Sequence, residues 1–94
     1  MIKSFGDKRT REVFERKYVK TFSPDFQRAS LRKLVMLEAA KVLEDLKIPQ
    51  GNRLEKLAGD REGQFSIRIN EQFRVCFEWV EGNAYGVEIV DYHS

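Results

Sequence analysis

Three short runs of alternating apolar and polar residues, separated by two tight turns, constrain the fold of this chain more than any other feature. The runs cover residues 65–69, 73–79 and 84–90, with turns at residues 70–72 and 81–83. A period of two is typical of strands that bury one face, and turns this short join antiparallel neighbours. The sequence therefore predicts a three-stranded antiparallel meander.

A short strand and a capped helix are predicted before this meander. Residues 2–5 alternate between apolar and polar side chains, and Gly6 and Asp7 end that run. The Asp7 carboxylate can accept a hydrogen bond from the first turn of a helix, which we expect over residues 8–18.

A second helix begins at the Ser23-Pro24 pair. A serine hydroxyl caps a first turn, and a proline at the first helical position loses no hydrogen bond it would have made. The apolar pattern stays helical to about Leu46, and residues 47–52 turn the chain. The chain is thus predicted to form one α+β domain over residues 1–94, with two helices covering one face of an antiparallel sheet.

Composition is that of a globular domain and argues against several classes of protein. Hydrophobic residues make up 41% and charged residues 34% of the chain, and no apolar run approaches the length of a membrane span. Cys76 is the only cysteine, so no internal disulfide and no thiol-based metal site are expected. We expect a cytoplasmic protein with no metal, no cofactor and no membrane partner.

Charge is unevenly distributed along the chain. Residues 1–30 hold eight basic and four acidic side chains, whereas residues 61–94 hold three basic and six acidic ones. A basic N-terminal part can follow a phosphate backbone. Solvated helix faces would give the same pattern, and the sequence leaves both interpretations open.

The alternation also sorts the predicted strands by face. The helix-covered face is expected to hold Phe65, Ile67, Ile69, Phe73, Val75, Phe77, Trp79, Tyr85, Val87 and Ile89. The opposite, open face is expected to hold Ser66, Arg68, Arg74, Cys76, Glu78, Glu88, Val90 and Tyr92, with His93 at its edge. Two guanidiniums on one face suit phosphate binding, although cross-strand ion pairs with Glu78 or Glu88 are the alternative.

A basic loop punctuated by glycines covers residues 53–63, just before the sheet. We expect Lys56 and Arg61 to overhang the open face from this loop, because functional side chains are common on loops above a rigid sheet. The phosphate-loop motif is absent, since no Gly-Lys-Ser/Thr follows.

These residues suit one reaction, the cleavage of RNA by the ribose 2′-hydroxyl. That reaction needs a base, an acid and cations that stabilise the phosphorane. His93, the only histidine, could transfer protons, and Arg74 could hold the phosphate. Tyr92 could stack on a base and Asp91 could orient His93. A chain end that packs or frays is the alternative for these last residues.

The same residues resemble the RelE/ParE toxin superfamily, and within it the HigB-type toxins. The likeness extends over nearly the whole chain and is carried by GNRLEKLAGDREGQFSIRINEQFRVCFEW and the closing VEIVDYH. It implies a RelE-like fold and a ribosome-dependent mRNA interferase that cuts in the 30S decoding site and leaves a cyclic phosphate. It also implies a helix-turn-helix antitoxin, through which alone operator DNA is reached.

The resemblance places Asp91, Tyr92 and His93 on the family's C-terminal catalytic residues and Arg74 on its phosphate-contacting arginine. We further expect RNA to be bound by the remaining basic residues of this region, namely Arg53, Lys56, Arg61 and Arg68.

One loop departs from the family pattern. Where members of the family carry a lysine before Gly-Asp and an upstream histidine, this chain has Ala58 and Glu55. A lysine there would stabilise the phosphorane, so its absence predicts weak cleavage unless Lys56, Arg61 or Arg68 replaces it.

Two other functions stay open at this point. A ParE-like protein would inhibit a topoisomerase such as gyrase without cutting nucleic acid. A non-catalytic protein would only bind the antitoxin and co-regulate its operon.

Overall fold

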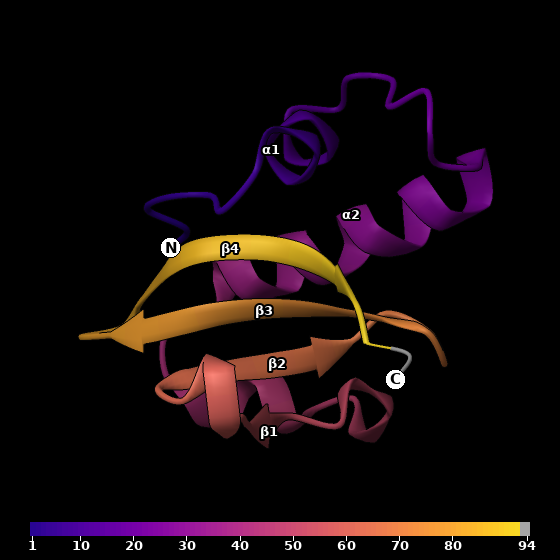
Figure 1. The fold of residues 1–94 in the computed structure, drawn as a ribbon. Coiled ribbons are helices and arrows are strands. Elements are labelled where there is room, and N and C mark those ends of the chain that lie inside the picture. Colours follow the sequence, from indigo (N-terminus) through magenta and orange to yellow (C-terminus); the bar gives the residue numbers. More distant parts are fainter. Residues whose placement is uncertain (93–94) are drawn as a thin grey trace.

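Four antiparallel strands form one sheet in the order β1-β2-β3-β4 (Figure 1). The computed structural model describes residues 1–92. Along the chain the elements are α1 (Lys8–Phe14), α2 (Pro24–Ala39), the 3-10 turns η1 (Leu43–Lys47) and η2 (Gln50–Asn52), β1 (Glu55–Lys56), the 3-10 turn η3 (Gly59–Arg61), β2 (Gln64–Arg68), β3 (Phe73–Val80) and β4 (Asn83–Asp91). The α+β prediction and the C-terminal meander are confirmed, whereas β1 lies in a segment expected to be loop.

The N-terminal segment lies alongside β4, parallel to it. Ile2 and Phe5 form isolated bridges with Ala84 and Val87, and the backbone N–H of Gly6 donates to Val87 O at 2.8 Å. The short strand expected at residues 2–5 is therefore present as two separate bridges.

Helix α1 begins where the sequence predicts and ends early. The Asp7 carboxylate accepts from the backbone N–H of Thr10 at 3.0 Å, as a helix cap does. The helix stops at Phe14, and not near residue 18, because Arg16 has a left-handed backbone with φ of 62°. From there Gln27 of α2 holds the chain, since its side chain accepts from the Val19 N–H and donates to the Lys17 carbonyl.

Helix α2 also begins as predicted and ends seven residues before Leu46. The Ser23 hydroxyl accepts from the N–H of Phe26 at 3.1 Å, and Pro24 takes the first helical position. After Ala39 the Asp45 carboxylate accepts from the N–H groups of Lys41 and Val42, at 2.8 and 3.2 Å. These bonds replace helical ones and start η1.

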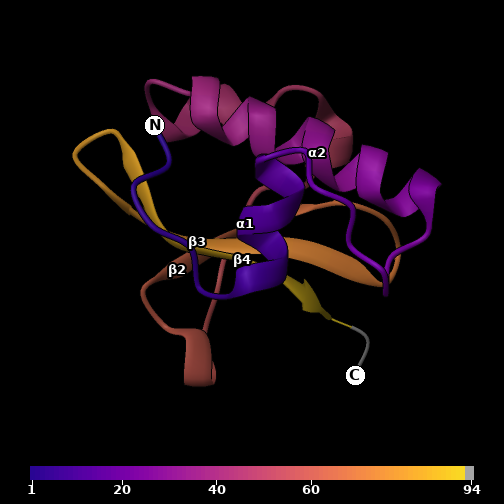
Figure 2. The same ribbon diagram turned by 90° about the horizontal axis from the view of Figure 1, so that it is seen from above.

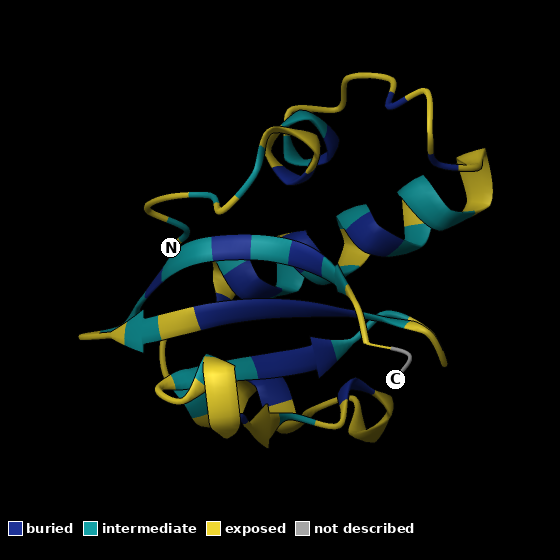
Figure 3. Ribbon diagram, viewed as in Figure 1, coloured by how far each residue is buried: buried dark blue, intermediate teal, exposed yellow. Residues whose placement is uncertain are grey.

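The helices and the sheet enclose the core. Figure 2 shows α2 along one side of the sheet and η3 on the other, while α1 packs against α2 and the edge of the sheet at β4. The middle of β3 is buried, as Figure 3 shows. Fully buried apolar side chains include Val13, Leu34, Leu37, Ile67, Val75, Phe77 and Val87. Each stabilises the fold by about 1.5–3 kcal/mol relative to exposure, which fixes the strands that carry the site.

A β-bulge in β4 changes the predicted sorting of faces. Cys76 pairs with Glu88, whereas Glu78 pairs with Tyr85, so β4 carries one extra residue between these two pairs. Gly86 lies in this stretch with φ of +61°, a conformation that glycine adopts without strain. Tyr85 consequently shares the face of Glu78, and its predicted place on the helix-covered face is wrong.

No helix within residues 1–92 has both the length and the apolar character needed to cross a bilayer.

Candidate functional site

Arg74 lies at the centre of the site, and hydrogen bonds from two of its nitrogens hold its guanidinium. Its Nε–H donates to Ser66 Oγ at 2.7 Å, and its Nη2 donates to the carbonyl of Arg53. Arg53 presents that carbonyl from a left-handed conformation, with φ of 44°, at the end of η2. The Arg74 residue is only 8% exposed, so burial and hydrogen bonds together restrict its guanidinium.

Two further side chains contact the same guanidinium. Glu55 of β1 forms an ion pair in which Oε1 lies 3.6 Å from Arg74 Nη1. The ring centroid of Tyr92 lies 5.7 Å from Arg74 Cζ, within the range of a cation–π contact. The tyrosine is 43% exposed, which leaves part of its ring open to solvent.

These groups border a pocket of about 290 Å³. Arg68 enters it from the end of β2, where its Nη2 lies 4.0 Å from Glu71 Oε1. The pocket is lined by Arg53, Glu55, Arg68, Asn70, Glu71, Arg74 and Tyr92. Three guanidiniums against two carboxylates make this a cationic site that suits a phosphate group.

Several predicted site residues therefore come together. Arg53, Arg68, Arg74 and Tyr92 line one pocket. The sorting of faces predicted that Arg68, Arg74 and Tyr92 lie together, and Arg53 joins them from the basic loop. Neither arginine on the strands takes the alternative cross-strand partners, because Arg68 pairs with Glu71 and Arg74 with Glu55. The sequence pattern gave no signal for Glu55 as a partner, since the two-residue strand β1 was not predicted.

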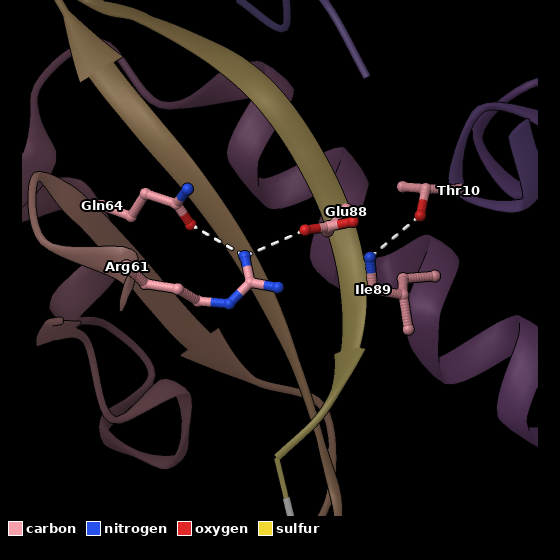
Figure 4. Close-up of polar contacts among 5 residues, drawn as sticks. All are labelled: Thr10, Arg61, Gln64, Glu88 and Ile89. Atoms are coloured by element: carbon pink, nitrogen blue, oxygen red, sulfur yellow. Dashed lines mark hydrogen bonds and ion pairs between the residues drawn. The ribbon is translucent and has the colours of Figure 1, made fainter. Parts of the chain in front are cut away.

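Arg61 lies over the open face, away from the pocket lining. Its Nη1 donates to Glu88 Oε1 at 2.9 Å and to Gln64 Oε1 at 3.1 Å, which brings the η3 loop across β3 toward β4 (Figure 4). The open face is accordingly covered at its centre, where Ser66 and Cys76 are fully buried. Burial raises the pKa of the Cys76 thiol above its usual range.

Lys56 lies on the other face. The register sets Lys56 opposite Phe65, whereas its neighbour Glu55 is opposite Ser66. Because side chains alternate along a strand, Lys56 shares the helix-side face with Phe65 and does not line the pocket. The expectation that it overhangs the open face is wrong, and the unpredicted strand β1 is the reason.

The C-terminal residues are described as far as Tyr92. The Asp91 carboxylate accepts from Gln72 Nε2 at 3.0 Å, and the N–H of Tyr92 donates to the Gln72 carbonyl at 2.7 Å. The turn between β2 and β3 thus fixes Asp91 and Tyr92 at the rim of the site. His93, the proposed proton-transfer group, lies outside the described residues.

Ala58, which stands where the family pattern has a lysine, lies outside the pocket lining. Ala58 is exposed, precedes η3 and is not among the residues that line the pocket. Among residues 1–92, no three His, Cys, Asp or Glu side chains gather closely enough to hold a metal ion.

A family model and two relatives identify one family, and a solved structure shares the fold. A family model described as "RelE-like toxin of type II toxin-antitoxin system HigB" matches residues 3–93. "Toxin HigB-1" of Vibrio cholerae serotype O1 is 41% identical over 85 residues, which cover 89% of this chain and 90% of that protein. "Endoribonuclease HigB" of Proteus vulgaris is 37% identical over 95 residues, which cover 99% and 100%. Among solved structures, the YoeB-YefM complex from Staphylococcus aureus contains a chain with the same fold, with a TM-score of 0.63, 15% identity and coverage of 100% and 99%.

Proposed function

The chain belongs to the RelE-like HigB toxin family of type II toxin-antitoxin systems, and on this premise we propose that it is an endoribonuclease that cleaves mRNA at the pocket around Arg74. The observation that carries the proposal is the fixed Arg74 guanidinium, whose Nη1 borders a cationic pocket beside a half-exposed tyrosine. The relatives named as HigB toxins do not favour a gyrase inhibitor or a non-catalytic co-regulator.

The proposed reaction is attack by the ribose 2′-oxygen on the adjacent phosphorus. The bond from phosphorus to the 5′-oxygen breaks, which leaves a 2′,3′-cyclic phosphate and a free 5′-hydroxyl. Arg74 would neutralise the charge that develops on the phosphorane, with Arg68 as a second cation in the pocket. One proton leaves the attacking 2′-hydroxyl and one reaches the departing 5′-oxygen, and His93 would serve as the base or the acid in this transfer. Asp91 would orient His93, and Tyr92 would stack on a base.

Glu55 limits how the phosphate can bind. Its carboxylate already lies 3.6 Å from Arg74 Nη1, so an incoming phosphate oxygen competes with it for that donor. Ala58 brings no lysine before η3, and the Arg61 guanidinium of η3 is paired with Glu88, so neither offsets this competition. Both features support slow cleavage.

Family membership supports the partners that we propose. We propose that a helix-turn-helix antitoxin neutralises the protein, and that operator DNA is reached only through it. The YoeB-YefM complex contains a chain with the same fold as this protein, which supports a protein partner. We further propose that mRNA is the substrate in the 30S decoding site, where the ribosome presents the strand to the Arg74 pocket, and that the toxin acts in the cytoplasm.

Cleavage of ribosome-bound mRNA by the Arg74→Ala variant tests the proposal. Primer extension should show codon-linked cuts with the wild type and none with Arg74→Ala. The matched control is Lys20→Ala, which removes an exposed cation outside the pocket and should still cut. Cleavage retained in Arg74→Ala would refute the site. DNA damage with intact mRNA would instead indicate a topoisomerase inhibitor.

A further inference from the structure

Ser66 has a contact that its place in the sheet does not require. It lies on β2, fully buried, directly opposite Glu55 on one side and Cys76 on the other. Its hydroxyl oxygen accepts from Arg74 Nε at 2.7 Å, although Arg74 is opposite Arg68 in the register and not opposite Ser66. The Arg74 side chain therefore runs diagonally across the sheet from β3 toward β1.

This contact determines which nitrogen of the guanidinium remains available to bind a phosphate in the pocket. Nε–H and one Nη2–H point in parallel along one edge of the planar group. Ser66 Oγ accepts from Nε, and Nη2 donates to the Arg53 carbonyl and, at 3.5 Å, to the Ser66 carbonyl, which leaves Nη1 for the pocket and for Glu55. Acceptors on two of its nitrogens fix both the plane and the rotation of a planar group.

We propose that Ser66 is a positioning residue, which acts through Arg74 and directs its Nη1 edge at the substrate phosphate. This inference rests on the proposed function. Alanine at position 66 leaves the buried Nε–H without this acceptor and the guanidinium held through Nη2 alone, so it can pivot about Nη2 toward Glu55 or Tyr92. Orientation of a charged donor at the reacting phosphate is worth about 10- to 100-fold in rate.

The experiment measures single-codon mRNA cleavage on purified ribosomes for Ser66→Ala. We expect kcat to fall about 10- to 100-fold while KM changes little, because the ribosome positions the mRNA and Arg74 acts on the transition state. Ser66→Thr keeps the hydroxyl and should restore most of the rate.

Ser30→Ala is the matched control, because Ser30 is an equally buried serine whose hydroxyl has no hydrogen-bond partner among residues 1–92. Its kcat should equal that of the wild type. Equal rates for Ser66→Ala and Ser30→Ala would overturn the positioning role alone, as would a Ser66→Thr variant no faster than Ser66→Ala. A wild-type protein that leaves ribosome-bound mRNA intact would overturn the proposed function itself and the positioning role with it.

Discussion

Arg68 and Arg74 are direct cross-strand partners in the pairing of β2 with β3, so two guanidiniums start from neighbouring positions of one sheet face. Like charges at directly opposed positions destabilise a sheet unless counter-charges offset them. Here Glu71 and Glu55 each pair with one of the arginines, from a turn and from the edge strand β1. Glu71 and Glu55 therefore offset the repulsion between the two arginines, while the pocket that the arginines line stays cationic.

An anion in this pocket should stabilise the fold. Inorganic phosphate at ten times its Kd should add about 1.4 kcal/mol to the free energy of unfolding, which raises Tm by roughly 5–10 °C. Differential scanning fluorimetry with phosphate, against chloride at equal ionic strength, measures the shift. Arg68→Gln should reduce it and Glu55→Gln should enlarge it, whereas an equal shift in all three proteins would place phosphate elsewhere.

A lysine at position 58 should increase cleavage. Ala58→Lys places a cation in the loop before η3. One added charge that reaches the phosphorane should raise the cleavage rate about 10-fold or more. The rate on ribosome-bound mRNA and toxicity on expression both report it. Ala58→Gln lengthens the side chain without charge and should leave the rate unchanged. Equal rates for the two variants would argue that weak activity has another origin.

Asn52→Ala should destabilise the turn that supports Arg53. The buried Asn52 amide donates to the Leu46 carbonyl at 3.1 Å and its oxygen accepts from Lys33 Nζ at 2.6 Å. Loss of these bonds in a buried place should cost about 1–3 kcal/mol, measured by urea unfolding. Gln50→Ala changes an exposed residue of the same turn and should cost far less. An unchanged free energy of unfolding in Asn52→Ala would contradict the anchoring role.

Asp45 should make the fold sensitive to acid. Hydrogen bonds from the N–H groups of Lys41 and Val42 hold the pKa of its carboxyl below the ordinary value of 3.8. A carboxyl with a lowered pKa stabilises the folded state above 3.8, and this contribution is lost as the pH falls through the lower folded value.

Unfolding of Asp45→Ala and wild type from pH 7 to pH 2 tests this. The wild type should be the more stable protein at pH 7, and the difference should narrow below pH 3.8. Glu44→Ala is the neighbouring control. A difference between Asp45→Ala and wild type that is independent of pH would show that the charge of Asp45 plays no part.

The strands and caps could be predicted because their signals are local. Alternation over residues 65–79 fixed two strands and placed Arg68 and Arg74 on one face, and Asp7 and Ser23 both cap helices. A short repeat and a capping oxygen act within a few residues, so no other part of the chain is needed to recognise them.

The predictions that were wrong depend on contacts between distant segments or on single backbone angles. Gln27 holds the chain after α1, and the left-handed Arg16 ends that helix, which no helical pattern reveals. Tyr85 changed face because β4 holds one extra residue. Glu55 was missed as a partner of Arg74 because a strand of two residues has no detectable period.

The parallel segment at residues 1–6 also affects how the sheet meets other chains. It places backbone hydrogen bonds along β4, which would otherwise offer a row of unpaired N–H and C=O groups. The opposite edge, β1, has only two residues. Within the described part of the chain the sheet therefore has no long edge of unpaired backbone groups. Few N–H and C=O groups are left to pair with the sheet of another copy, which disfavours edge-to-edge aggregation.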